Sequence, residues 1–204
     1  MTEATSHRLI GLIGLKGSGK DTAADALEAI GFQNVKFAGA LKAMLKTLLA
    51  YQGANENTIG RMIDGDLKEV PTDLLNGKTP RFAMQTLGTE WGRDLIGADF
   101  WLDTAMKKAS TGDTVITDCR FPNEVEAVKT NGGTVIRIVA VGQTVFGEDG
   151  VGTDHASEVL MASLPEDYTI KNNMAKPGEV VADVIWSFKV AFVVMVTRLF
   201  GAKK

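Results

Sequence analysis

The 204-residue sequence predicts an α/β fold in which a five-stranded parallel sheet carries helices on both faces. The first observation behind this prediction is that short apolar runs of strand length alternate with longer runs of helical patterning. The second is that a strand, a crossover helix and a further strand in sequence produce parallel pairing. The third is that glycine-rich or polar segments follow three of the strands, where parallel sheets bind their ligands.

The first quarter of the chain begins this alternation. The apolar run Leu9–Ile13 predicts the first strand, and the Ala-rich run Lys20–Ile30 predicts the helix after it. Val35–Phe37 predicts a short second strand. Leucines recur every three or four residues in Ala40–Tyr51, which predicts an amphipathic helix. The segment Gly53–Gly77 is polar, acidic and rich in turn residues, which predicts short helices and loops at the surface.

A second helical stretch begins at Thr79 and Pro80. A hydroxyl can accept hydrogen bonds from the first N–H groups of a helix, and proline is well tolerated at the first helical position. The helix is expected to extend to Leu87 or beyond. Asp99 can cap the next helix, Phe100–Lys108.

The remaining chain returns to strands and helices. Thr114–Thr117 predicts the third strand, Pro122 begins a helix that ends at about Thr130, and Thr134–Val139 predicts the fourth strand. Beyond a glycine-rich acidic loop from Gly142 to Asp154, the pattern predicts a short helix at His155–Met161, a last strand at Tyr168–Ile170 and a final helix that begins at Pro177.

Composition excludes several classes of function. The formal net charge of −3 provides no broad basic surface for nucleic acid. The single cysteine, Cys119, excludes an intrachain disulfide and a cysteine-cluster metal site, and it fits a reducing cytoplasm. The N-terminus is polar and short, and glycines and Lys16 interrupt the apolar run that follows, so the sequence predicts a strand there and not a signal peptide.

The C-terminal segment Val180–Phe200 is mostly apolar. Its longest uncharged run, Val190–Thr197, is far shorter than the ~20 residues that span a bilayer, so no transmembrane segment is predicted. The pattern favours a buried terminal helix. A homodimer contact or attachment to a membrane surface is the alternative.

The segment between the first strand and the first helix has the pattern of a phosphate-binding P-loop. Glycines let backbone N–H groups wrap a polyphosphate, and the following helix directs the positive end of its dipole at the same phosphates. Lys20 adds a cation, and the hydroxyl of Thr22 can bind Mg²⁺. The motif predicts nucleoside triphosphate binding. The alternative is that the glycines only form a tight turn after a buried strand. Its residues are Gly14, Leu15, Lys16, Gly17, Ser18, Gly19, Lys20, Asp21 and Thr22.

The third predicted strand ends in Asp118, which is the pattern of a Walker B strand. Such a carboxylate lies beside a P-loop and holds Mg²⁺ directly or through water. Arg120 follows two residues later, and its guanidinium can bind a phosphate through two hydrogen bonds. The alternative for Asp118 is a simple turn or cap, and for Arg120 a structural salt bridge to Asp118 or Glu124.

A second group of polar side chains lies between Thr79 and Asp94. Arg81 and Gln85 are four residues apart and share one face of a helix. If the helix continues, the next residues on that face are Gly88, Thr89 and Gly92, so the side chains there are small. Such a face suits contact with a ligand, with arginine for a monoester phosphate and glutamine for a base edge. The alternative is an ordinary solvated face.

His155 and Glu158 follow the acidic loop. They are candidates for contact with a substrate. The alternative is a structural role in which Asp154 or Ser157 caps the short helix and Glu158 completes a capping box.

Taken together, these motifs resemble the deoxynucleoside monophosphate kinases of tailed bacteriophages. The Lys20-Asp21-Thr22 ending of the P-loop is also the form seen in nucleoside monophosphate kinases such as adenylate kinase. The resemblance covers most of the chain, and the order of the motifs is more specific than any one of them. They are Gly17-Ser18-Gly19-Lys20-Asp21-Thr22, Phe37-Ala38 with Leu41-Lys42, Gln85 with Leu87-Gly88-Thr89, Arg93, Trp101, Asp118-x-Arg120, Gly132-Gly133-Thr134-Val135-Ile136, His155 with Glu158, and Ile170-x-Asn172.

The resemblance implies transfer of the γ-phosphoryl group of ATP to a dNMP, with Mg²⁺, in the host cytoplasm if the protein is phage-encoded. It implies the three-layer fold of P-loop kinases as one domain over residues 1–204. A helical substrate-binding insertion is expected at about residues 38–110 and a lid-like loop at about residues 142–156.

The resemblance also implies roles for individual residues. Lys20, Asp118 and Arg120 would be catalytic, and Thr22 and Asp118 would bind the metal. The ATP site would comprise Gly14, Gly17, Ser18, Gly19, Lys20, Asp21 and Thr22. The dNMP site would comprise Lys42, Arg81, Gln85, Thr89, Glu90, Arg93, Trp101, His155 and Glu158.

The chain departs from the family pattern after the fourth predicted strand. Family members often carry Arg-Pro-Gly there, whereas this chain has Ala140-Val141-Gly142 and no arginine from there to Asp154. Arg137 is nearby but lies within the strand, so a cationic lid is not evident, and Arg120 or Arg93 is expected to carry more of the transition-state charge. Two rivals stay open: another small-molecule P-loop kinase, acting on dephospho-CoA or phosphomevalonate, and a nucleotide-dependent partner-binding module.

Overall fold

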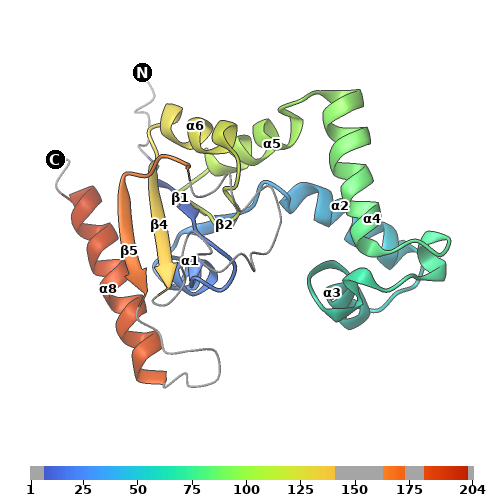
Figure 1. Cartoon of the computed structure of the whole chain (residues 1–204), viewed down its shortest axis with the longest axis horizontal. Helices are drawn as coiled ribbons and strands as arrows, with labels where there is room; N and C mark the ends of the chain where they lie inside the picture. Colours follow the sequence, from blue (N-terminus) through green and yellow to red (C-terminus); the bar gives the residue numbers. More distant parts are fainter. Residues whose placement is uncertain (1–6, 141–162, 173–181, 202–204) are drawn as a thin grey trace, which may run out of the picture. The chain divides into compact units, whose positions relative to one another are not determined.

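The computed structural model describes residues 7–140, 163–172 and 182–201, with side chains in the last segment described from residue 192 (Figure 1). The chain forms two compact units, residues 1–35 with 106–204 and residues 36–105. The first unit contains the sheet, and the second consists of helices and their connections. The second unit covers most of the range, about 38–110, in which a helical insertion is expected.

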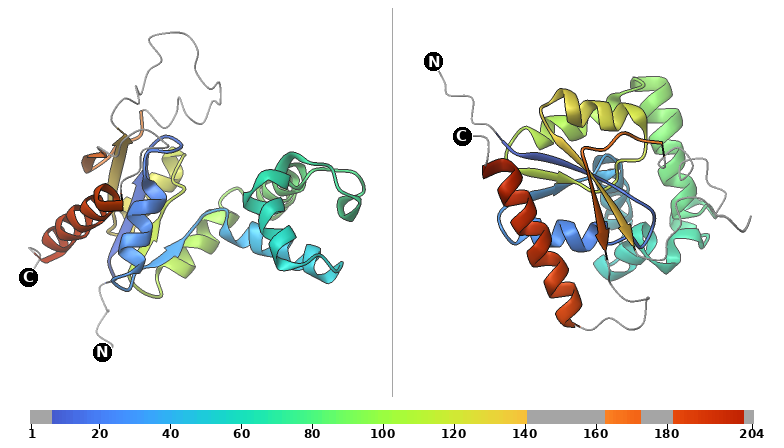
Figure 2. Two further views of the ribbon diagram at one scale, coloured as in Figure 1. Left: turned by 90° about the horizontal axis from the view of Figure 1, so that it is seen from below. Right: turned by 60° about the vertical axis from the view of Figure 1, so that its left-hand side comes forward.

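The sheet has the strand order β2-β3-β1-β4-β5, and its four neighbouring pairs are all parallel (Figure 2). The prediction of a five-stranded parallel sheet is therefore confirmed. β1 has the predicted bounds, and β3, β4 and β5 differ from theirs by one or two residues at one end. The strands are β1 (Leu9–Ile13), β2 (Gln33–Val35), β3 (Thr114–Ile116), β4 (Thr134–Ala140) and β5 (Tyr168–Asn172).

The second strand begins and ends two residues earlier than predicted. The prediction followed the apolar residues up to Phe37, whereas pairing with β3 begins at the polar residue Gln33. The Gln33 backbone N–H donates to the Asp113 carbonyl at 2.8 Å, and its side-chain amide donates to Thr114 Oγ1 at 2.8 Å. Hydrogen bonds of the backbone and side chain of Gln33 thus determine where the strand starts. A pattern of hydrophobic residues does not reveal these bonds.

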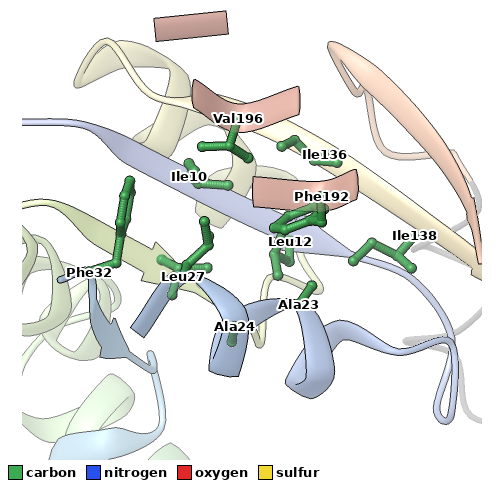
Figure 3. Packing of buried hydrophobic residues seen from close by; sticks show 11 residues of the cluster. Ile10, Leu12, Ala23, Ala24, Leu27, Phe32, Ile136, Ile138, Phe192 and Val196 are labelled. Carbon is green, nitrogen blue, oxygen red and sulfur yellow. The ribbon is translucent and has the colours of Figure 1, made fainter. Parts of the chain in front are cut away.

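Two helices cover one face of the sheet, α1 (Lys20–Glu28) and α8 (Ala182–Gly201). Phe192 and Val196 of α8 are buried in the same cluster as side chains of β1 and α1, so the prediction of a buried terminal helix is confirmed (Figure 3). No helix in the described part of the chain is long and apolar enough to cross a membrane. The buried cluster includes Ile10, Leu12, Ala23, Ala24, Leu27, Phe32, Val115, Ile136, Ile138, Phe192 and Val196.

The opposite face of the sheet is covered by α6 (Pro122–Thr130), which has the predicted bounds. A Cβ atom added at Gly11 of β1 would lie 3.3 Å from Val128 of α6 and 3.3 Å from the sulfur of Cys119. Gly11 therefore allows this helix to pack close to the central strand. With helices on both faces, the first unit has the predicted three-layer arrangement.

Replacing Phe192 with alanine should lower the free energy of unfolding by about 3–5 kcal/mol, because the ring is 1% exposed and its removal leaves a cavity. Urea unfolding followed by circular dichroism measures this loss. Val194 provides a matched control on the same helix, since it is 42% exposed and its replacement by alanine should cost less than about 0.5 kcal/mol. Equal, small effects of both changes would contradict the assignment of α8 to the core.

The helical unit has its own core, formed by Leu45, Leu49, Ile59, Met62, Ile63 and Met84. As predicted, Pro80 is the first residue of α4, and Thr79 Oγ1 caps it by accepting from the Phe82 N–H at 3.1 Å. The elements are α2 (Gly39–Tyr51), α3 (Glu56–Asp64), the 3₁₀ helices η1 (Asp66–Glu69) and η2 (Asp73–Leu75), α4 (Pro80–Thr86), the π-helix η3 (Leu87–Ile96) and the start of α5 (Phe100–Ala109).

Candidate functional site

The loop between β1 and α1 has the backbone that a P-loop requires. Gly14, Gly17 and Gly19 have φ angles of +149°, +79° and +102°, a region that side chains with a Cβ atom rarely adopt. A Cβ atom at Gly14 would lie 2.3 Å from the Ile138 carbonyl oxygen and 2.8 Å from Ser18 Oγ. The backbone of β4 therefore lies directly behind the loop, and only glycine fits at this position.

Lys20 is the first residue of α1, and its side chain folds back over the loop. Its ammonium group donates to the Gly14 carbonyl at 2.7 Å and to the Leu15 carbonyl at 2.8 Å. The positive charge is thus held against the loop backbone, at the helix end where the dipole is positive. A loop of this form can bind the phosphates of a nucleotide.

Ser18 connects the loop to the far strand of the sheet. The amide of Asn172, at the end of β5, donates to the Ser18 carbonyl at 2.9 Å, and both residues are buried. Within the described residues the Ser18 hydroxyl has no hydrogen-bond partner. Asn172 is not among the site residues predicted from the sequence, although it belongs to the motif Ile170-x-Asn172 of the family resemblance.

The residues after β3 leave the sheet at the same edge as the P-loop. Because β3 pairs with β1 in parallel, with Ile116 opposite Gly11, Asp118 follows β3 on the side where Gly14 follows β1. Asp118 is partly exposed, as is Thr22 in the first turn of α1. A carboxylate and a hydroxyl are oxygen ligands of the kind that Mg²⁺ prefers.

No group of three His, Cys, Asp or Glu side chains in the described residues could hold a metal ion. A site that uses one or two protein oxygens together with phosphate oxygens and water is the usual arrangement for Mg²⁺ beside a nucleotide. The donor set of Thr22 and Asp118 therefore fits this ion.

Arg120 follows Asp118 in an exposed position. The expected alternative, a salt bridge to Asp118 or Glu124, is absent from the ion pairs of the described residues. Glu124 instead accepts hydrogen bonds from the backbone N–H groups of Arg120 at 2.7 Å and Phe121 at 3.1 Å.

Cys119, which lies between Asp118 and Arg120 in the chain, is fully buried. Burial, together with the charges of Asp118 and Glu124, raises the pKa of its thiol. The thiol is therefore protonated and unreactive.

Arg137 lies within the sheet, as expected, and its side chain is hydrogen-bonded there. Its side chain is buried within β4, where one guanidinium nitrogen donates to the Leu164 carbonyl at 2.6 Å and to Glu166 Oε2 at 2.9 Å. The hydrogen bond from Arg137 lowers the pKa of Glu166. Arg137 therefore connects β4 to the segment before β5, in agreement with its expected place within the strand.

Within the helical unit, Lys42 and Arg81 are each paired with a carboxylate. Lys42, in α2, donates to Asp64 at the end of α3, and Arg81, in α4, donates to Glu69 in η1. Burial alone would raise the pKa of Asp64, but the hydrogen bond and charge of Lys42, with the charges of Lys46 and Lys68, lower it overall. The charges of Lys42 and Arg81 both act on Lys68, so the two cations are part of one charged region that the sequence did not show as a unit.

Four further candidates, Gln85, Thr89, Glu90 and Arg93, are exposed on α4 and η3. Arg81 and Gln85 lie one turn apart on α4, as predicted. Beyond Thr86 the chain forms a π-helix, so the predicted continuation of that face in α-helical spacing is wrong.

Trp101 gives the physical reason for this change. Its indole N–H donates to the Gly88 carbonyl at 2.9 Å, and its ring lies against Gly92, where an added Cβ atom would be 2.1 Å from Nε1. A side chain that bonds to a helix carbonyl interrupts the regular ladder. Gly92 is thus buried against an aromatic ring that packs with Trp91 and Phe100, and it does not form the small-residue ligand face that the sequence suggested.

Two of the expected site residues, His155 and Glu158, and the lid-like loop at about 142–156 lie outside the described residues. Trp101 is buried, so in this structure it packs the helical unit and bonds to Gly88. The structure thus brings the P-loop and Asp118 to one edge of the sheet, and it brings Lys42 and Arg81 into one charged region of the helical unit.

Comparison with known proteins identifies a relative that covers most of the chain and others that cover part of it. The sequence pattern of a family described as deoxynucleotide monophosphate kinase matches residues 68–175. A protein of Acanthamoeba polyphaga mimivirus named as a deoxynucleotide monophosphate kinase is 34% identical over 183 residues, covering 81% of this chain and 88% of the relative. A deoxynucleoside-5'-monophosphate kinase of Escherichia phage T5 is 31% identical over 98 residues, covering 44% of this chain and 36% of the relative. Among solved structures, a dephospho-CoA kinase from Campylobacter jejuni aligns with 94% of this chain and 96% of its own, at 13% identity and a TM-score of 0.49.

Proposed function

The chain belongs to the deoxynucleotide monophosphate kinase family, and from this premise we propose which residues bind the phosphoryl donor and which bind the acceptor. A kinase of this kind transfers a phosphoryl group from ATP to a dNMP and releases a dNDP. The observation that carries our assignment is the P-loop, in which the Lys20 ammonium is held against the loop backbone at the N-terminus of a helix.

The P-loop is the ATP site. The positive φ angles of Gly17 and Gly19 allow N–H groups of the loop to turn toward the β- and γ-phosphates. Lys20 exchanges its bonds to the two loop carbonyls for bonds to the phosphates, and Ser18 and Asp21 lie in the same cradle. Ser18 adds a buried hydroxyl that has no partner within the described residues.

Thr22 and Asp118 are the residues that would hold Mg²⁺. Thr22 comes after β1 and Asp118 after β3. Because these two strands are adjacent and parallel, both residues follow at the same end of the sheet, which supports this assignment. The ion, when bound, neutralises charge on the phosphates.

The helical unit is the dNMP site. Lys42 and Arg81 bind the phosphate, because ammonium and guanidinium groups recognise phosphate oxygens by charge and by paired hydrogen bonds. Gln85, one turn from Arg81, contacts the base edge. Exposed Thr89, Glu90 and Arg93 complete this surface, and Trp101 positions it by packing beneath η3.

The chemistry requires little beyond positioning and charge. A phosphate oxygen of the dNMP is already a nucleophile, so no general base is needed. Arg120, exposed beside Asp118, stabilises charge on the transferred phosphoryl group. Positioning and charge stabilisation together account for most of the rate enhancement in phosphoryl transfer.

A coupled assay of ADP release tests the proposed function. The acceptors to be compared are the four common dNMPs, the corresponding NMPs, dephospho-CoA and phosphomevalonate. We expect ADP release to rise with at least one dNMP. Stimulation by dephospho-CoA or phosphomevalonate alone would refute the assignment of the acceptor, and slow hydrolysis insensitive to every acceptor would indicate a nucleotide-dependent binding module.

Replacing Arg81 with alanine should raise KM for the dNMP by about tenfold or more while KM for ATP stays unchanged, because the guanidinium bonds to phosphate are charge-assisted. Steady-state kinetics with each substrate varied in turn measure both values. Arg61 is the matched control, since it pairs with Asp66 at 2.7 Å in the same unit, and its replacement by alanine should leave both values unchanged. An equal loss of ATP affinity in the Arg81 variant would contradict the division of roles.

Replacing Asn172 with alanine should raise KM for ATP by about tenfold, since it leaves the buried Ser18 carbonyl without its donor and loosens the loop backbone. KM for the dNMP should change little. Asn131, whose amide donates to the Ala127 carbonyl at the end of α6, provides an exposed asparagine as a control. An unchanged KM for ATP in the Asn172 variant would show that β5 does not fix the loop.

A further inference from the structure

A third cation, Lys68, lies in the same charged region as Lys42 and Arg81. Lys68 and Glu69 belong to η1, which packs against α3 and α4, and α2 packs against α3 and α4 in turn. Burial, followed by the positive charges of Lys42 and Arg81, lowers the pKa of Lys68. Lys42 and Arg81, which belong to two other elements, are therefore both close enough to repel the charge of Lys68.

The carboxylates nearby do not neutralise this region. Asp64 is bonded to Lys42 and Glu69 to Arg81, whereas Lys68 forms no ion pair within the described residues. Lys46, whose charge also acts on Asp64, adds a fourth cation, so four positive charges and two negative charges leave a surplus of two. Asp64 and Glu69 raise the pKa of Lys68 by less than its burial and the charges of Lys42 and Arg81 lower it. Such a region favours an anion that carries more than one charge.

The two ion pairs are also weakly held. The side chains of Asp64 and Glu69 are 56% and 59% exposed, and exposed ion pairs of this kind contribute little to stability. The phosphate of a dNMP carries a charge of about −1.5 to −2 at neutral pH, and its oxygens can contact several cations at once. It is therefore favourable for the phosphate to replace the two carboxylates as the partner of Lys42 and Arg81.

We infer that Lys68 is a third phosphate-binding residue of the dNMP site, and that Asp64 and Glu69 are internal anions which the substrate phosphate displaces from Lys42 and Arg81. This inference rests on the proposed function. Lys68 contacts the phosphate directly, whereas Asp64 and Glu69 keep Lys42 and Arg81 oriented toward the site while it holds no substrate.

Calorimetric binding to the full-length protein tests the inference, with the dNMP that turns over fastest and with its deoxynucleoside, which lacks the phosphate. Lys68→Met should weaken dNMP binding about tenfold and leave deoxynucleoside binding unchanged. Lys68→Arg should retain binding within about threefold, because it keeps the charge. Glu69→Gln and Asp64→Asn should each tighten dNMP binding by about two- to fivefold.

Two control variants belong to the same unit. Lys78→Met removes a lysine that lies over the ring of Phe82, and Glu56→Gln neutralises a carboxylate at the opposite end of α3 from Asp64. Both should bind the dNMP as the wild type does. Circular dichroism of every variant confirms that it is folded.

Three results would overturn the inference while the proposed function stands: unchanged dNMP binding by Lys68→Met, an equal loss of deoxynucleoside binding by that variant, or weaker binding by Glu69→Gln. The last result would mean that Glu69 supports Arg81 instead of competing with the phosphate. A wild-type protein that binds and phosphorylates no dNMP would refute the proposed function itself, and with it the inference.

Discussion

Replacing Lys20 with alanine should lower kcat about 10²- to 10³-fold with every dNMP that the enzyme accepts. The reason is the proposed role of Lys20 at the ATP phosphates: ATP is the donor for every acceptor, and a positive charge at the N-terminus of α1 would neutralise charge on the transferred group. The variant also loses the two hydrogen bonds that hold the side chain across the loop, at 2.7 and 2.8 Å. Coupled ADP-release kinetics measure the loss.

The same variant should bind dNMP normally, because the residues proposed for the acceptor belong to the helical unit. Calorimetric dNMP binding within about twofold of the wild-type value would show this. Lys107→Ala is the control, since it removes an exposed lysine of α5 that belongs to the same unit as the P-loop. If Lys20→Ala retained more than about a tenth of the wild-type kcat, the assigned role of Lys20 would be wrong.

Replacing Gly14 with alanine should abolish ATP binding and destabilise the first unit by about 3–5 kcal/mol. Two costs combine in this estimate. The φ angle of +149° is rarely adopted by residues with a Cβ atom, and the added carbon would lie 2.3 Å from a backbone oxygen of β4. A backbone atom in a central strand cannot move aside as a flexible side chain can, so both the sheet and the loop would shift.

Thermal unfolding and ATP titration measure the two effects of Gly14→Ala. Gly112→Ala is a suitable control, because an added Cβ atom there meets only the Gln33 amide at 3.8 Å. That control should unfold and bind ATP as the wild type does. A Gly14→Ala protein with unchanged unfolding temperature would mean that the close approach of β4 to the loop is absent in solution.

The P-loop could be read from the sequence because its conformation depends on residues that are neighbours in the chain. Gly14, Gly17 and Gly19 show positive φ angles at the positions the motif predicts. The start of α4 is local in the same way, since Thr79 and Pro80 lie next to the N–H groups they affect. Alternation of strands and helices was likewise sufficient to predict the parallel sheet.

Features that depend on distant contacts could not be predicted. The π-helix after Thr86 depends on a bond from Trp101 to Gly88, and α-helical spacing gives no sign of it. Lys68 lies in a polar segment with no motif of its own, and only the packing of η1 brings it near Lys42 and Arg81. Asn172 appeared in the family pattern, but its contact with Ser18 is visible only in the folded sheet.

The contact between Asn172 and Ser18 also constrains when the donor site can form during synthesis of the chain. The two residues are 154 positions apart, and β1 has no sheet partner before β3 and β4, which begin at Thr114 and Thr134. Residues 36–105 form a continuous unit and can acquire their core while the later strands are still being translated. Although the P-loop emerges from the ribosome early, its contact with Asn172 forms only after β5 has been made, so we expect ATP at the proposed donor site to stabilise only nearly full-length chains.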